Sequence, residues 1–176
     1  MEPVTGREAV ARLTGLISPK FQVHGYSIDL TAKQIYGLDP NGQVDFGGTE
    51  YTSSARVPVA SLRRNKEDKY EWWDLTRGCY MLEFNEGLRL EENEIAILEP
   101  DDRLLRCGAM HGMTFLRGQG ERMETLLMVG TMSVNIKQNA RVSRLRIFRF
   151  GTPQAAAAAG SAAGKKKAAR GKKKGR

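Results

Sequence analysis

Apolar positions from Phe21 onward fall in short segments, mostly six to ten residues long, separated by Gly, Asn, Asp and Pro. Such segments are typical of β-strands, because strands are short and the turns between them need residues that tolerate unusual backbone angles. The predicted strands are Ser27–Ile35, Val57–Leu62, Tyr70–Phe84, Asn93–Leu98, Thr125–Val129 and Val142–Phe148. The pattern therefore predicts a mainly β domain of the sandwich, jelly-roll or closed-barrel type.

Five local signals add detail to these strands and to the turns between them. Residues 39–42, Asp-Pro-Asn-Gly, predict a tight turn, since Pro presets one turn dihedral and Gly supplies a positive φ. Pro58 favours an edge strand, because proline cannot donate to a β-ladder. Arg77-Gly78 predicts a break within segment 70–84, and the apolar run Thr125–Val129 predicts a fully buried strand. A turn at Gln138-Asn139 precedes the last strand.

Only the start of the chain has a helical pattern. Val10, Leu13, Leu16 and Ile17 recur at helical spacing, and Thr5 can serve as the N-cap. Pro19 is expected to end this helix, since the residue before a proline avoids helical angles. We therefore expect a short amphipathic helix over Gly6–Ile17.

Charge divides the 176 residues into a body, 1–150, and a tail, 151–176. The tail holds eight lysines and arginines and no acid, which accounts for the whole net charge of +8, because the body's 20 basic residues equal its 20 acidic ones. The tail is rich in Ala, Gly and Lys and has no large apolar residue, so we expect it to be disordered. Its cluster Lys165–Arg176 either binds polyanions such as nucleic acid without sequence preference or only adds solubility.

Few residues of the body suggest chemistry. Cys79 and Cys107 are too few for a disulfide framework, and no apolar run is long enough for a signal peptide or membrane span, so a cytoplasmic, reducing compartment is expected. No phosphate-binding loop, dinucleotide fingerprint or zinc-spaced Cys/His cluster is present in the sequence. The acidic pair Asp101-Asp102 is either a Mg²⁺ site or a solvated turn.

Three stretches, taken in order, resemble the dUTPase/dCTP deaminase superfamily. They are His24–Leu30 (HGYSIDL), Gly78–Gly108 (with FNEG, an apolar strand, Pro and LLRCG) and Thr114–Phe148 (ending in VNIKQNARVSRLRIF). The order and spacing of these stretches carry the resemblance, which covers residues 20–150 and is closest to archaeal-type dUTPases that are similar to dCTP deaminases. It implies a distorted jelly-roll or β-barrel of the dUTPase-like type with a short N-terminal helix. It also implies a homotrimer with active sites at the subunit boundaries and Mg²⁺-dependent hydrolysis of dUTP to dUMP and pyrophosphate.

The same resemblance assigns candidate site residues. Substrate contacts fall to Arg106, Arg103 and Gly118, and Asp101 and Asp102 are candidates for a Mg²⁺ site. The catalytic carboxylate is left open between Asp101, Asp102 and Glu124. Asp29 is expected to be a structural or secondary carboxylate.

The chain departs from the family pattern at the positions where the catalytic residues are expected. The position of the expected catalytic carboxylate is Leu116, that of the tyrosine is Gln119, and that of the deaminase glutamate is Leu126. Leucine cannot activate water. Three alternatives follow: a dUTP diphosphatase with a relocated carboxylate, an inactive superfamily member that acts as a nucleotide- or nucleic-acid-binding trimer through its basic tails, and a purely topological similarity.

Overall fold

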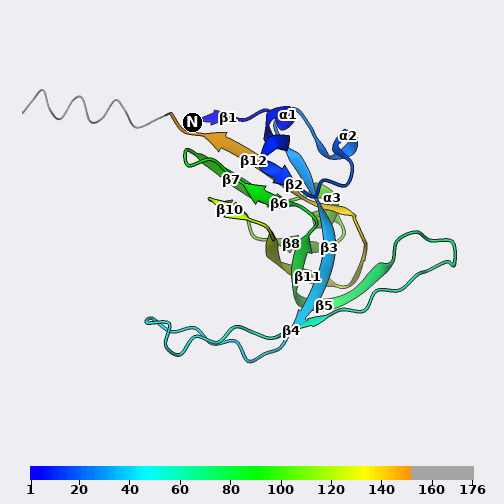
Figure 1. The fold of residues 1–176 in the computed structure, drawn as a ribbon. Coiled ribbons are helices and arrows are strands. Elements are labelled where there is room, and N and C mark those ends of the chain that lie inside the picture. Colours follow the sequence, from blue (N-terminus) through cyan, green and yellow to red (C-terminus); the bar gives the residue numbers. More distant parts are fainter. Residues whose placement is uncertain (152–176) are drawn as a thin grey trace, which may run out of the picture.

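The computed structural model describes residues 1–151 and shows a mainly β architecture (Figure 1). Nine strands form one antiparallel sheet with the order β8-β11-β5-β3-β12-β7-β9, in which β1 adds to β12 and β4 adds to β3. A second sheet has the order β10-β6-β2. The predicted fold class is confirmed, while the expectations for the tail, including Lys165–Arg176, lie outside the described residues.

The strands are β1 (Glu2–Pro3), β2 (Leu13–Thr14), β3 (Ile28–Leu38), β4 (Arg56–Pro58), β5 (Trp72–Phe84), β6 (Gly87–Arg89), β7 (Glu94–Pro100), β8 (Ala109–His111), β9 (Thr114–Leu116), β10 (Gln119–Gly120), β11 (Glu124–Lys137) and β12 (Arg141–Arg149). The helical elements are α1 (Gly6–Ala9), the 3₁₀ turn η1 (Val10–Arg12), α2 (Pro19–Gln22) and α3 (Asp102–Arg106).

Strand β3 is the point at which the large sheet curls. Its first part, Ile28–Thr31, pairs with β12, and its second part, Ala32–Gly37, pairs with β5. The register shifts within each of these two pairings, as it does at a β-bulge. Bulges increase the local twist of a sheet. The sheet therefore wraps into a half-barrel around a core that includes Leu30, Leu82 and Leu145, each at most 1% exposed.

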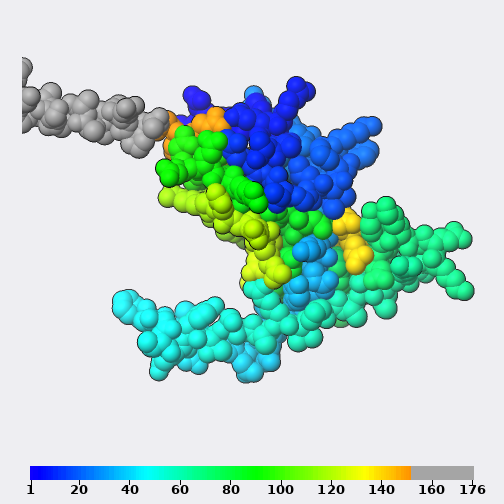
Figure 2. All heavy atoms as spheres, in the orientation of Figure 1, coloured from blue at the N-terminus to red at the C-terminus, as the bar shows by residue number. Residues whose placement is uncertain are grey.

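Two long connections project from this body (Figures 1 and 2). Residues 39–55, between β3 and β4, form an arm held by a bridge between Gln43 and Thr52. The tight turn predicted at residues 39–42 is wrong, because the Asp39 N–H donates to the Ala55 carbonyl oxygen, the chain runs on to the bridge, and Gly42 has no positive φ. Its side chains Val44, Phe46 and Tyr51 are exposed. Residues 59–71 form the other projection, on the opposite side in Figure 1.

The N-terminal helix is shorter than the sequence predicts. Thr5 caps it as expected, because its hydroxyl accepts a hydrogen bond from the Glu8 backbone N–H at 3.3 Å. Helical structure nevertheless ends at Arg12, because Leu13 pairs with Leu88 of β6 and Gly15 takes a φ of +76°. Strand pairing therefore overrides the helical spacing of the remaining apolar residues.

Two predictions about strands are wrong in detail. Strand β5 continues through Arg77-Gly78, so the predicted break is absent, but its ladder with β11 is irregular at this position, between the pairs Gly78–Val129 and Thr76–Ser133. The apolar run 125–129 is not buried on both faces, because Leu127 is buried whereas Leu126 and Met128 are 43% and 38% exposed. Strand β4 does lie on an edge, as Pro58 indicates, since it pairs only with β3. No helix within residues 1–151 is long and apolar enough to cross a membrane.

Candidate functional site

Helix α3 is the first component of the candidate site, and the sequence did not predict it. Pro100 ends β7, and Asp101 then takes extended backbone angles and caps the helix. Its carboxylate accepts a hydrogen bond from the Arg103 backbone N–H at 3.0 Å, which satisfies a free donor of the first helical turn. The acidic pair is therefore a helix start, and the signal was an Asp directly after a strand-ending proline.

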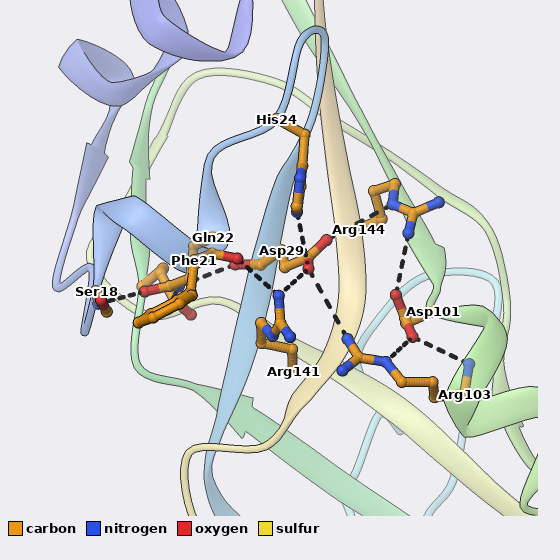
Figure 3. Close-up of polar contacts among 10 residues, drawn as sticks. Ser18, Phe21, Gln22, His24, Asp29, Asp101, Arg103, Arg141 and Arg144 are labelled. Atoms are coloured by element: carbon orange, nitrogen blue, oxygen red, sulfur yellow. Dashed lines mark hydrogen bonds and ion pairs between the residues drawn. The ribbon is translucent and has the colours of Figure 1, made fainter.

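An open hollow of about 460 Å³ lies between α3, β3 and β12 (Figure 3). We call it the arginine hollow, and its lining residues are His24, Ser27, Asp29, Asp101, Asp102, Arg103, Arg141 and Arg144. The β3–β12 register forms it, because this register sets Arg144 directly opposite Asp29.

Asp29 lies at the centre of the arginine hollow, and its side chain is 3% exposed. Its Oδ2 lies 3.0 Å from Nε2 of His24, 3.3 Å from Nη1 of Arg141 and 3.9 Å from Nη2 of Arg103. Its Oδ1 has no hydrogen-bond partner among the described residues, and Nε of Arg144 is 3.6 Å away. Three guanidinium groups thus converge on one buried carboxylate (Figure 3).

Helix α2 fixes the backbone beside this carboxylate. The Gln22 amide donates to the Asp29 carbonyl oxygen at 2.9 Å and accepts from the Ser18 N–H at 2.7 Å. Arg141 also donates to the Phe21 carbonyl oxygen at 2.7 Å. The position of Arg141 is therefore set by two contacts that come from different elements.

Asp101 is the second buried carboxylate of the hollow. Nε of Arg103 donates to its Oδ1 at 2.8 Å, and Nη2 of Arg144 donates to its Oδ2 at 3.1 Å. Burial alone would raise the pKa of the Asp101 carboxyl, but the hydrogen bonds from Arg103 outweigh burial and hold that pKa below its usual range. Asp101 is therefore an anion that holds two arginines in place.

The balance of charge suits an anionic ligand. Arg103, Arg141 and Arg144 keep 55%, 34% and 33% of their side chains exposed, so part of each guanidinium faces the solvent in the hollow. The three guanidinium groups face three carboxylates, those of Asp29, Asp101 and Asp102, and Asp102 is paired in addition with Arg106. With Arg106 counted, four arginines meet three acids, which leaves a surplus of one positive charge. Guanidinium groups match the geometry of phosphate oxygens, so this surplus fits a phosphate group.

The acidic pair does not fit a Mg²⁺ ion held by the protein. Both carboxylate oxygens of Asp101 accept from arginines, and the exposed Asp102 carboxylate pairs with Nε of Arg106 at 2.7 Å. Within residues 1–151, no group of three or more His, Cys, Asp or Glu side chains could hold a metal ion. Three guanidinium groups around Asp29 also repel a cation from its free oxygen.

The other predicted site residues lie elsewhere. Gly118, with a φ of +72°, lines a separate hollow with Leu90 and Glu91. Glu124 lines a third hollow and accepts from Arg56 at 2.7 Å, and this hydrogen bond lowers the pKa of the Glu124 carboxyl. Leu116 lies on β9, half-buried. One chain therefore brings together Arg103, Asp101 and Asp102 but leaves Gly118 and Glu124 in other hollows.

The sequence reasoning missed Arg141 and Arg144. Their side chains reach the hollow because β12 lies beside β3, a pairing that no local motif encodes. The only available signal was Asp29 itself, since a carboxylate between the apolar residues Ile28 and Leu30 requires a cation from elsewhere in the fold.

Comparison with known proteins gives both sequence relatives and a fold relative. No protein-family model matches the chain. A probable deoxyuridine 5'-triphosphate nucleotidohydrolase of Methanosarcina acetivorans is 30% identical over 138 residues, which is 77% of each chain. The corresponding protein of Methanosarcina mazei is 30% identical over 142 residues, or 80% of each chain, and that of Archaeoglobus fulgidus is 28% identical over 134 residues, or 75% of each chain.

Among solved structures, a 2'-deoxycytidine 5'-triphosphate deaminase from Agrobacterium tumefaciens has a similar fold, with a TM-score of 0.62 and 14% sequence identity. The match covers 85% of this chain and 48% of the deaminase chain, so this chain spans about half the length of that protein. At this identity, the similarity shows the fold alone.

Proposed function

The chain belongs to the dUTPase/dCTP deaminase superfamily, and from this premise we propose that it binds the triphosphate of dUTP in the arginine hollow and hydrolyses dUTP to dUMP and pyrophosphate. The observation that carries the proposal is the convergence of Arg103, Arg141 and Arg144 on one open hollow. The archaeal relatives are named as probable dUTP hydrolases, and this similarity indicates dUTP as the substrate.

The proposed reaction needs no covalent bond between the protein and the substrate. The oxygen of water bonds to the α-phosphorus, the bond from this phosphorus to the α–β bridging oxygen breaks, pyrophosphate leaves, and one proton passes to solvent or to a base. The three guanidinium groups would stabilise the charge that builds up on the phosphate oxygens. Arg106, at the end of α3 and largely exposed, could swing toward a bound phosphate once it leaves Asp102.

Asp102 is our candidate for the carboxylate that orients the water. It lines the arginine hollow and its side chain is 65% exposed, whereas Asp101 is fully occupied by arginines and Glu124 lines another hollow. We attribute the expected Mg²⁺ requirement to the phosphates of the substrate, because Mg²⁺ keeps much of its water shell and reaches many enzymes through substrate phosphates.

We also propose that the protein is a homotrimer. Exposed apolar side chains gather where β11 lies beside β8 and where the chain leads on to β9, namely Met110, Met113, Phe115, Leu126 and Met128. Met128 lies directly opposite Met110, and exposed apolar side chains that lie together are typical of a protein interface.

A second candidate function is binding without turnover. Leu116 stands where the family resemblance places the catalytic carboxylate, and this observation favours a scaffold that keeps the nucleotide but not the reaction. In that case the basic segment Lys165–Arg176 would let the trimer hold nucleic acid through several tails, with affinity increased by tethering. Salt-sensitive DNA binding that disappears on deletion of residues 152–176 would support this assignment.

The deciding experiment combines binding and turnover. Release of dUMP and pyrophosphate from dUTP with Mg²⁺ is measured beside dCTP, dTTP and UTP, and binding of a non-hydrolysable dUTP analogue is measured by calorimetry. The variant Arg144→Gln should weaken binding about ten-fold or more, since it removes a phosphate contact. Arg146→Gln is the matched control, because Arg146 lies on the same strand but pairs with Glu99 outside the hollow.

Selective dUTP turnover supports the first function. Binding without turnover supports the second. Equal binding by both variants would overturn the arginine hollow as the phosphate site.

A further inference from the structure

The arm at residues 39–55 projects from the body and does not pack on it (Figure 2). Its two limbs are joined by the Asp39 N–H, which donates to the Ala55 carbonyl oxygen at 3.0 Å, and by the bridge between Gln43 and Thr52. Within residues 1–151, no hydrogen bond or ion pair joins residues 40–54 to a residue outside the arm, and none of these residues is buried. A two-stranded ribbon of this kind gains little stability from its own packing.

The shape of the arm is nevertheless specified at both ends. Near the tip, the Asp45 carboxylate accepts from the Gly48 N–H at 2.9 Å and from the Glu50 N–H at 3.2 Å, which fixes the turn. At the base, both Nη atoms of Arg56 donate to the Glu124 carboxylate, one of them at 2.7 Å, which ties the start of β4 to the start of β11. The arm is therefore a formed projection whose base is held in place.

Three apolar side chains are gathered toward the tip of the arm. Val44 and Tyr51 lie opposite each other, one position beyond the bridge, and Phe46 follows two positions after Val44. Val44 and Tyr51 are largely exposed, and Phe46 is fully exposed, so no part of its ring is covered. Exposed apolar side chains that lie together mark a contact surface.

An open space separates the arm from segment 109–123, which is drawn in yellow-green (Figure 2). This segment and the start of β11 carry the apolar surface beside β11, which consists of Met110, Met113, Phe115, Leu126 and Met128. The chain therefore has two uncovered apolar surfaces, one on the arm and one on the body. These two surfaces do not meet within one copy, because the side chains near the tip of the arm remain exposed.

The charges around the two surfaces are opposite. The arm has three acids, Asp39, Asp45 and Glu50, and no lysine or arginine, which gives it a formal charge of −3. Segment 109–123 has two exposed arginines, Arg117 and Arg122, and one acid, which gives it a formal charge of +1. Opposite charges of this kind steer one surface toward the other and favour this pairing over an arm-to-arm contact.

We propose that the arm of each copy docks on the apolar surface beside β11 of a neighbouring copy, and that Phe46 is buried in this contact. The two surfaces differ, so the contact is heterologous, and three such contacts close a ring. This inference rests on the homotrimer in the proposed function and states how its copies hold one another. A second copy of the chain supplies the cover for both surfaces.

Cross-linking of the full chain tests the contact directly. Phe46→p-benzoylphenylalanine places a photoreactive group near the tip of the arm. Leu62→p-benzoylphenylalanine is the matched control, because Leu62 is also exposed but lies on the projection 59–71. After irradiation, the Phe46 variant should give covalent dimers and trimers on a denaturing gel, and mass spectrometry should place the cross-link within residues 109–128. The Leu62 variant should give neither.

A truncating variant measures how much the contact contributes to assembly. Phe46→Ser should raise the dissociation constant of the trimer about ten-fold or more in analytical ultracentrifugation, since burial of a phenylalanine side chain is worth at least that factor. Its far-ultraviolet circular dichroism spectrum should not change, because Phe46 is fully exposed in one copy and makes no contact that the fold needs. Leu62→Ser, the matched control, should leave dissociation unchanged.

The outcomes separate this inference from the proposed function. If the protein is a trimer but Phe46 gives no cross-link between copies, or if Phe46→Ser leaves dissociation unchanged, the arm contact is overturned and the trimer stands. Cross-links confined to a single copy, or equal cross-linking from Leu62, would also overturn it. A protein that is monomeric throughout would overturn the arm contact together with the trimer, whereas nucleotide binding and turnover are measured separately and decide the rest of the proposed function.

Discussion

Asp101 accepts two hydrogen bonds from Arg103, one from its backbone N–H at 3.0 Å and one from its Nε at 2.8 Å. The same carboxylate therefore starts helix α3 and orients a guanidinium group toward the arginine hollow. Helix capping and ligand binding are coupled through one side chain, and this coupling can be tested by changing its charge.

The variant Asp101→Asn should be less stable but should bind tripolyphosphate more tightly. Asn can still cap the helix, but the charged hydrogen bonds to Arg103 and Arg144 are lost, which costs about 1–3 kcal/mol of unfolding free energy. The hollow also gains one positive charge overall, which favours an anion. Urea unfolding and calorimetry measure the two effects, and Asp102→Asn, at an exposed position, should change stability by less than about 0.5 kcal/mol. Weaker tripolyphosphate binding by Asp101→Asn would contradict this prediction.

Glu94 makes the fold sensitive to acid. Arg12 donates to it at 2.8 Å, and Arg149 does so at 2.8 Å. Burial opposes its ionisation, but these hydrogen bonds outweigh burial and lower the pKa of the Glu94 carboxyl to about 2. Because the folded pKa lies below the unfolded one, the stabilisation is complete above about pH 4.5 and is lost as the pH falls toward 2. Glu94→Gln should remove about 2 kcal/mol of this pH dependence, measured as unfolding free energy from pH 5 to pH 2. An acid profile that Glu94→Gln leaves unchanged would refute the assignment.

His111 adds a second pH dependence nearer neutrality. It is buried, its Nδ1 lies 2.9 Å from the Gly112 carbonyl oxygen, and its Nε2 lies 2.7 Å from the Ser143 hydroxyl. The Gly112 carbonyl can only accept, so Nδ1 carries the proton and Nε2 accepts from Ser143. Burial lowers the pKa of the His111 imidazole. The neutral ring therefore stabilises the fold fully above about pH 6.5, and the effect is lost as the pH falls below that value through the folded pKa.

The pH dependence of unfolding between 7 and 5.5 should be weaker in His111→Gln than in the unsubstituted protein. Ser143→Ala should cost about 1–3 kcal/mol at pH 7.5, because it leaves Nε2 without a donor. Denaturant unfolding at several pH values measures both effects. Parallel profiles for the protein and His111→Gln would show that this imidazole is not responsible.

The apolar surface beside β11 should hold the copies together. Met128→Lys places a charge in that surface and should convert a trimer into monomers in light scattering, with far-ultraviolet circular dichroism unchanged. Leu62→Lys is the control, since Leu62 is also exposed but lies on the projection 59–71. A protein that is already monomeric before substitution, or a trimer that survives Met128→Lys, would contradict the assignment of this surface.

Local patterns were enough for the β-rich class, the turn at Gln138-Asn139 and the edge position of Pro58, because each depends on neighbouring residues only. These patterns failed where pairing between strands that are far apart in the sequence decides the structure. Leu13 leaves its helical pattern to pair with Leu88, and the alternate exposure of Leu126 and Met128 depends on which face of β11 meets the core.

The candidate site shows the same division. The resemblance drew attention to Asp101, Asp102 and Arg103, which are neighbours in the sequence. It could not supply Arg141 and Arg144, more than 110 positions after Asp29, because only the β3–β12 register brings them to that carboxylate. A strand register of this kind cannot be read from a single sequence. Covariation among related sequences would be needed to show which strands pair.

Strand β12 also sets the order in which the chain can fold during synthesis. It is the last strand of the described body, and it joins β3, β7 and β1, which are all made earlier. These three strands stay without their common neighbour until Arg149 has left the ribosome. Closure of the half-barrel is therefore a late, non-local event, which slows folding and leaves sheet edges open to association in the meantime. A chain that stops before Arg141 would consist of two unjoined halves and would be a substrate for chaperones and proteases rather than a smaller folded protein.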